Sequence, residues 1–156
     1  MNKPEKNRYF VLIADDSSDD RFLLRSAMRR ATRLNIVAEV GDGSGVIAYL
    51  KGQDAYADRK RYPLPDLLLL DLKMPQMDGF EVLEWLRTHS IAGMSIVVLT
   101  DSMQPEHIKQ ALDLGADLFQ VKPRANPERE ALALALEQYL ITAARSVPRQ
   151  LSNHPG

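Results

Sequence analysis

The stretch Asp66-Leu-Leu-Leu-Leu-Asp71 is a short apolar run enclosed by two acids, and Pro63 and Pro65 stand just before it. Four leucines are too few for a buried helix, and the prolines ahead of them disfavour one. A continuous apolar run of this length is typical of a strand that is buried on both faces of a parallel sheet. We therefore predict a central strand that ends at Asp71.

Four other short apolar runs share this form and are predicted to be strands: Tyr9–Ala14, Ile36–Val40, Ser95–Thr100 and Leu118–Val121. Segments with apolar residues at helical spacing lie between and after them. We predict helices from Ser17 or Ser18 to about Thr32, Val46 to Leu50, Phe80 to Thr88, Pro105 to Leu114 and Pro127 to Ala144. The first of these is expected to turn Phe22, Leu23, Ala27, Met28 and Ala31 toward the core. Strands that alternate with helices imply a parallel sheet with helices on both faces. The expected fold class is α/β, with five strands and five helices in three layers.

The chain of 156 residues has the length of one ordinary domain and is long enough to bury a core. We expect a polar N-terminal segment at 1–8, one domain at 9–144 and a disordered tail at 145–156. The polar stretch from Gln53 to Pro65 is predicted to be an extended loop. No internal repeat and no second domain are evident.

Composition excludes several classes of function. The formal net charge of -1 and a pI near 6.3 argue against a general nucleic-acid-binding protein, which needs a basic surplus. The absence of cysteine excludes disulfides and thiolate metal sites. The first residues lack the apolar core of a signal peptide, and the apolar runs are too short to span a membrane. We expect a cytoplasmic protein.

Polar side chains stand at the carboxyl end of four of the predicted strands. These residues are Asp15, Asp16, Asp71, Thr100 and Lys122. In an open parallel sheet, ligands bind outside the carboxyl ends of the strands, so we expect these side chains to converge on one edge.

Three carboxylates in one place repel one another unless a cation balances them. Oxygen ligands without cysteine favour a hard ion, Mg²⁺ or Mn²⁺. Such an ion leaves one carboxylate free as a nucleophile, and Asp71 is the best candidate because it ends the central strand. For in-line attack on a phosphoryl donor, the metal, Lys122 and the Thr100 hydroxyl would each stabilise one of the equatorial oxygens.

The same residues stand in five short motifs. These are Asp15-Asp16, Leu70-Asp71-Leu-Lys-Met-Pro75, Met77-Asp78-Gly79, Leu99-Thr100 and Lys122-Pro123. Together, and in this order, they resemble the receiver domain of two-component response regulators. The resemblance covers roughly Tyr9 to Ala144. It implies a flavodoxin-like, doubly wound sheet of strand order 2-1-3-4-5.

The resemblance also implies roles for individual residues. Asp71 would accept a phosphoryl group from the phosphohistidine of a sensor histidine kinase or a histidine phosphotransfer protein. Asp16, Asp71 and the backbone carbonyl of Lys73 would ligate Mg²⁺ directly, and Asp15 would act partly through water. Lys122 would pair with the phosphoryl group. Thr100 would move toward that group as the switch, and Phe119 matches the aromatic position that follows this movement.

We expect no output domain after Ala144. The loop Gln53–Pro65 and the run Leu67–Leu70 resemble the stand-alone receivers that partner bacterial phytochromes and related sensor kinases. Such a protein acts through contact with an unknown downstream protein. We expect it not to be an enzyme, beyond catalysing its own phosphorylation and dephosphorylation.

Two positions depart from the usual receiver pattern. Lys73 stands two residues after the acceptor, where a polar uncharged residue is common. Asp101 follows Thr100 directly, where a small residue is usual. We interpret both as residues that tune the lifetime of the phosphoryl group.

The last helix carries apolar residues on more than one side. Leu134 and Ile141 lie seven residues apart and away from the predicted core face. A helix that is apolar on two sides usually buries both. We therefore predict a homodimer or a partner contact through the last two helices.

Three other functions compete with the phosphoacceptor. An aspartate-nucleophile phosphatase would need an acid two residues after the nucleophile, where Lys73 stands. A flavodoxin-like cofactor binder would need a phosphate-binding loop after the first strand, where Asp15 and Asp16 would repel phosphate. A degenerate receiver that binds partners without phosphorylation is disfavoured because all five pocket residues are present.

Overall fold

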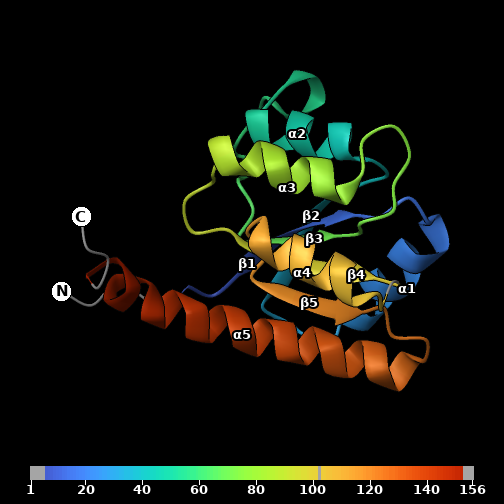
Figure 1. Cartoon of the computed structure of the whole chain (residues 1–156). Coiled ribbons are helices and arrows are strands. Elements are labelled where there is room, and N and C mark those ends of the chain that lie inside the picture. The colour runs from blue at the N-terminus through green and yellow to red at the C-terminus, as the bar shows by residue number, and fades with distance from the viewer. Residues whose placement is uncertain (1–5, 102, 153–156) are drawn as a thin grey trace.

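The computed structural model describes the backbone of residues 6–101 and 103–152, and side chains up to residue 143 (Figure 1). Its strands are β1 (Tyr9–Ala14), β2 (Leu34–Val40), β3 (Leu67–Leu70), β4 (Ser95–Thr100) and β5 (Leu118–Val121). Its helices are α1 (Ser18–Met28), α2 (Gly43–Lys51), α3 (Gly79–Thr88), α4 (Pro105–Asp113) and α5 (Asn126–Ser152), with a 3-10 turn η1 (Asp54–Tyr56).

The five strands form one parallel sheet in the order β2-β1-β3-β4-β5. The flavodoxin-like order and the five-helix, three-layer architecture expected from the sequence are confirmed. The chain crosses from one side of the sheet to the other after β2, so β1 and β3 are neighbours at the centre. In this topology the crevice beside the carboxyl ends of β1 and β3 is the place where ligands bind.

The four leucines of β3 divide the core in two. Leu68 and Leu70 pack with residues of α2, α3 and α4 on one face of the sheet. Leu67 and Leu69 pack with residues of α1 and α5 on the other. Figure 1 shows α2 and α3 on the opposite side of the sheet from α5. Each leucine is at most 2% exposed, so each burial stabilises the fold by about 2 kcal/mol.

The first helix is shorter than predicted. It ends at Met28, because the amides of Arg29 and Arg30 donate to carbonyls three residues back in a tighter turn. Its core side also differs: Phe22, predicted to face inward, is 55% exposed, whereas Leu24 is buried. The spacing of the apolar residues predicts that one side of this helix is buried. It does not determine which side of the helix faces the sheet.

The last helix is longer than predicted. α5 continues through Pro148 to Ser152, so the predicted disordered tail is helical over 145–152, and 153–156 lie outside the described residues. The physical reason is that no glycine occurs between Gly115 and Gly156 to end the helix. Across the described ranges, no helix combines the length and hydropathy that crossing a bilayer requires.

The segment between α2 and β3, predicted to be a loop, contains η1 and is tied to α2. The Arg59 guanidinium donates to the carbonyl oxygens of Tyr49, Leu50 and Tyr62 at 2.9, 2.7 and 3.2 Å. The Tyr49 hydroxyl donates to the carbonyl oxygen of Pro63 at 2.7 Å. These bonds fix the entry of the chain into β3.

Candidate functional site

The structure brings the predicted polar residues to one edge of the sheet. Asp15 and Asp16 directly follow β1, Asp71 follows β3, Thr100 is the last residue of β4, and Lys122 follows β5. Asp15, Asp71 and Thr100 are buried, with 6, 5 and 0% of their surface exposed, whereas Asp16 is exposed. Buried polar groups in such a position need partners or a function.

The ammonium of Lys122 lies among three carboxylates. Its Nζ is 2.7 Å from Asp15 Oδ2, 2.9 Å from Asp20 Oδ2 and 2.9 Å from Asp71 Oδ2. The contact with Asp20 was not predicted, because an acid in the first turn of a helix is ordinarily read as a response to the helix dipole. No local pattern in the sequence signals this contact, because Asp20 and Lys122 are 102 positions apart.

Burial and ion pairing act in opposite directions on this cluster. Burial raises the pKa of Asp15 above its ordinary value of 3.8 and outweighs the hydrogen bonds from Lys122 and Ser17. Burial alone would lower the pKa of Lys122, but its hydrogen bonds to Asp15, Asp71 and Asp20 raise the pKa above the ordinary value of 10.5. Lys122 is therefore fully protonated at neutral pH and remains a cation in the site.

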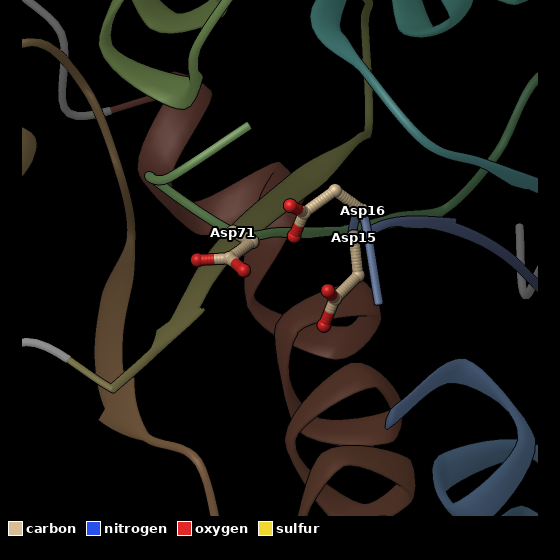
Figure 2. A group of neighbouring side chains, drawn as sticks. All are labelled: Asp15, Asp16 and Asp71. Atoms are coloured by element: carbon tan, nitrogen blue, oxygen red, sulfur yellow. The ribbon is translucent and has the colours of Figure 1, made fainter. Parts of the chain in front are cut away.

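Asp15, Asp16 and Asp71 form a cluster suited to a metal ion (Figure 2). One oxygen from each carboxylate lies within 4.8 Å of the others. Backbone amides orient two of them: Ser17 N–H donates to Asp15 Oδ1 at 2.9 Å, and Lys73 N–H donates to Asp71 Oδ1 at 3.2 Å. Three hard oxygen ligands with one carboxylate open to solvent fit a hydrated divalent cation such as Mg²⁺ or Mn²⁺.

An arginine of α1 holds the turn that carries two of these acids. Arg21 Nη1 donates to the backbone carbonyl oxygen of Asp15 at 2.5 Å, and its Nε lies 3.5 Å from Glu39 Oε1 on β2. The amide of Asp15 donates to the carbonyl oxygen of Val40 at 3.0 Å. The turn after β1 is thus fixed from both α1 and β2.

Gly79 allows the loop after β3 to close against the acceptor strand. Its amide donates to the carbonyl oxygen of Leu72 at 3.0 Å. A Cβ at this position would meet the backbone carbonyl of Asp71 and lie 2.8 Å from Leu72 Cα. Close packing next to Asp71 therefore requires a glycine at position 79.

We expect Gly79→Ala to lower the free energy of unfolding by about 2 kcal/mol, because the added Cβ meets backbone atoms that cannot rotate away. Urea unfolding followed by circular dichroism measures this change. Gly41→Ala is the matched control, since a Cβ added at Gly41 would have Arg21 Nη1 as its nearest neighbour, at 3.9 Å. Equal stability of the two variants would contradict the close-packing argument.

The Thr100 hydroxyl is buried and has no hydrogen-bond partner among the described residues. Such an unsatisfied group costs about 1–3 kcal/mol and calls for an explanation. Its place at the end of β4, beside β3, which Asp71 directly follows, suits a donor for a group attached to Asp71.

The remaining predicted residues lie around this centre. Phe119 is half-buried and lines a surface cavity of about 430 Å³ together with Met103 and Ile108. Lys73 is exposed. Asp101 is exposed and lines a cavity of about 290 Å³ that Asp15, Asp20 and Lys122 also line. The switch role of Phe119, the tuning roles and the Lys73 carbonyl ligand stay predictions.

The predicted contact face of α5 is only partly available. Leu134 is 47% exposed, whereas Ile141 is half-buried against the core on the α1 and α5 side of the sheet. Leu112 on α4 is also exposed, at 44%. The homodimer through the last two helices stays a prediction that concerns Leu134 and not Ile141.

The chain resembles known regulators in both sequence and structure. It is 34% identical over 128 residues to the nitrate/nitrite response regulator protein NarL of Escherichia coli, covering 82% of this chain and 53% of that protein. The chain thus spans about half the length of this relative. It is 29% identical over 115 residues to the response regulator Rcp1 of Synechocystis, covering 73% of this chain and 76% of Rcp1.

Among solved structures, the phosphorylated cyanobacterial phytochrome response regulator RcpA superimposes with a TM-score of 0.76 at 26% identity, covering 86% of this chain and 94% of RcpA. The Mn²⁺-bound form of Rcp1 gives a TM-score of 0.72 at 25% identity and covers 85 and 94% of the two chains. The family model described as the response regulator receiver domain matches residues 11–135. This chain therefore belongs to the receiver domains of two-component response regulators.

Proposed function

We propose that this chain is a phosphoacceptor whose Asp71 takes a phosphoryl group from the phosphohistidine of a sensor histidine kinase or a histidine phosphotransfer protein. The observation that carries the proposal is the buried Asp71 carboxylate, with Oδ2 2.9 Å from Lys122 Nζ and two further carboxylates within reach of a shared cation. A nucleophile, a cation beside it and a candidate metal site are the groups that phosphoryl transfer needs.

The transfer forms one bond and breaks another at phosphorus. An oxygen of Asp71 attacks phosphorus, the bond from phosphorus to the donor nitrogen breaks, and its electron pair stays on the imidazole of the donor. The Lys122 ammonium balances charge on the phosphoryl oxygens. The Thr100 hydroxyl, which has no partner in the described part of the chain, donates to one of them. A bound Mg²⁺ or Mn²⁺ would supply the remaining positive charge, held by Asp15, Asp16 and Asp71.

The alternatives fare less well against the geometry. A phosphatase would need an acid where Lys73 stands, and that lysine is exposed and forms no ion pair among the described residues. A phosphorylation-independent binding module would not need a buried acidic cluster, whose maintenance costs free energy. The likeness to RcpA supports a phytochrome-class kinase as the donor, and we expect the relay to operate in the cytoplasm.

Incubation with acetyl phosphate and Mg²⁺ tests the proposal directly. We expect intact-mass spectrometry to show the addition of one phosphoryl group, because attack at phosphorus releases acetate as the leaving group. Chelation of the metal with EDTA should prevent the addition, and hydroxylamine should release the phosphate and leave a hydroxamate in its place, as befits an acyl phosphate. A chain that stays unmodified with metal, or gains a hydroxylamine-stable phosphate, would refute the assignment.

Lys73 and Asp101 are proposed to tune how long the phosphoryl group persists. Asp101 lines the cavity beside Lys122, where a carboxylate repels an anionic nucleophile or donor. We expect Asp101→Ala and Lys73→Asn each to change the dephosphorylation rate about threefold, since an exposed charge contributes up to about 1 kcal/mol. Decay of the phosphorylated mass after donor removal measures it; unchanged decay in both variants would end this proposal.

A further inference from the structure

Lys122 has a carboxylate partner that stands outside the candidate metal cluster. Two of its three contacts, Asp15 and Asp71, belong to the group that could hold a cation. The third, Asp20 at 2.9 Å, does not. Asp20 lies in the first turn of α1, on a different element from the strand ends that carry the other two.

The three contacts match what a lysine ammonium requires. The group has three N–H donors and no acceptor, and its four-carbon stem is flexible and can adopt many rotamers. Three carboxylate oxygens at 2.7, 2.9 and 2.9 Å therefore define one position for Nζ. With only 10% of its side chain exposed, Lys122 has little water to replace a lost partner.

Asp20 is itself held in place. The side chain of Ser17, the N-cap of α1, accepts a hydrogen bond from the Asp20 amide at 3.1 Å. The carboxylate sits where the positive end of the helix dipole favours a negative charge. A side chain anchored on a helix is a more precise support than one on a free loop.

The three carboxylates that contact Lys122 differ in what else they bind during the reaction. A divalent cation attracts the oxygens of Asp15 and Asp71, and a phosphoryl group on Asp71 alters the oxygens that face Nζ. Of the three contacts, only Asp20 binds neither the cation nor the phosphoryl group. We propose that Asp20 is a positioning residue that keeps the Lys122 ammonium beside Asp71 during phosphoryl transfer, an inference that rests on the proposed function.

The test compares initial rates of phosphorylation by acetyl phosphate at saturating Mg²⁺ for the wild type, Asp20→Ala, Asp20→Glu and Asp19→Ala. Asp19 is the matched control, because it lies in the same helical turn, is exposed and forms no ion pair among the described residues. The cavity beside Asp20 leaves room for the longer glutamate.

We expect Asp20→Ala to slow phosphorylation about fivefold. The loss of a buried hydrogen bond between charged groups would slow the reaction more than this. The expected loss is smaller here because 41% of the Asp20 side chain is exposed, so water screens its charge. Asp20→Glu should recover most of the rate, and Asp19→Ala should match the wild type. A merely structural or general charge effect would not separate these variants.

A second readout needs neither metal nor phosphoryl donor. In EDTA, urea unfolding measures the loss of unfolding free energy in Asp20→Ala, in Lys122→Met and in the double variant. The loss in the double variant should differ from the sum of the two single losses. In the matching double-mutant cycle with Asp19→Ala, the losses should add. Calorimetry should show Mg²⁺ affinity unchanged by Asp20→Ala within about twofold, since Asp20 lies outside the cluster.

The outcomes separate the two ideas. An unphosphorylated wild type would overturn the proposed function and the role of Asp20 with it. A phosphorylated wild type with an equal or faster Asp20→Ala rate would overturn only the role of Asp20, as would an equal loss in Asp19→Ala or a loss explained by weaker Mg²⁺ binding.

Discussion

Asp71→Asn should abolish phosphorylation, so that no phosphoryl mass appears after incubation with acetyl phosphate and Mg²⁺. An amide of the same shape is not a nucleophile at phosphorus, and no other carboxylate ends the central strand. A rate decrease of at least 10³-fold is expected, in line with the loss of a covalent nucleophile.

The variant should fold at least as well as the wild type, which makes the result interpretable. Asp71 is 5% exposed and shares Lys122 with Asp15 and Asp20, so removing one negative charge relieves repulsion. Asp19→Asn, an exposed acid on α1, is the control and should accept the phosphoryl group normally. Phosphorylation that persists in Asp71→Asn at the wild-type rate would show that the acceptor is another residue.

Lys122→Met should cost about 3 kcal/mol of unfolding free energy in EDTA, the second large effect expected. The substitution keeps the apolar stem but leaves Asp15 and Asp71 buried without their cation. Removing one partner of a buried ion pair costs about 3–5 kcal/mol, and the half-exposed Asp20 places this case at the lower end. Urea unfolding at neutral pH measures it.

Two conditions should reduce this deficit. Saturating Mg²⁺ should recover part of it, because a dication supplies the charge that the lysine no longer provides. Acid should also reduce it: burial raises the pKa of Asp15 above 3.8 in the folded protein, so protonation favours the folded state and stability is lost as pH rises through that pKa. Loss of the Lys122 ammonium raises the pKa of Asp15 further, because the hydrogen bond from Lys122 lowers it in the wild type.

Lys109→Met is the control for charge removal. Lys109 lies 2.8 Å from Asp113 in an exposed pair on α4, and its loss should leave stability nearly unchanged. A deficit for Lys122→Met as small as that of Lys109→Met, or one indifferent to Mg²⁺, would mean that the acidic cluster is stabilised by something other than the ammonium.

The sheet and most of the site could be predicted because they depend on local signals. A run of four leucines between prolines and an acid permits little besides a buried strand, and parallel strands necessarily bring Asp15, Asp71 and Lys122 to one edge. The family resemblance then supplied the strand order, which no periodicity contains.

What could not be predicted depends on angles and contacts between distant segments. The side of α1 that faces the sheet is set by packing against β1 and α5, so Leu24 is buried where Phe22 was expected. The pairing of Asp20 with Lys122 joins residues 102 positions apart. The end of α5 depends on the absence of a strong stop signal, which is weaker evidence than the presence of one.

The proposed switch role of Thr100, whose hydroxyl has no hydrogen-bond partner among the described residues, would set the size of the response that this domain can give. A group without a hydrogen bond has none to break, so reorientation toward an oxygen on Asp71 gains a bond at no exchange. That gain is about 1–3 kcal/mol, the cost of the unsatisfied group, and alters the ratio of two conformations by a factor between about 5 and about 150. A bias of this size makes the second conformation dominant only where the two conformations already lie within about 3 kcal/mol of each other in free energy. The resting domain is therefore expected to sample its second conformation appreciably before any phosphoryl group arrives.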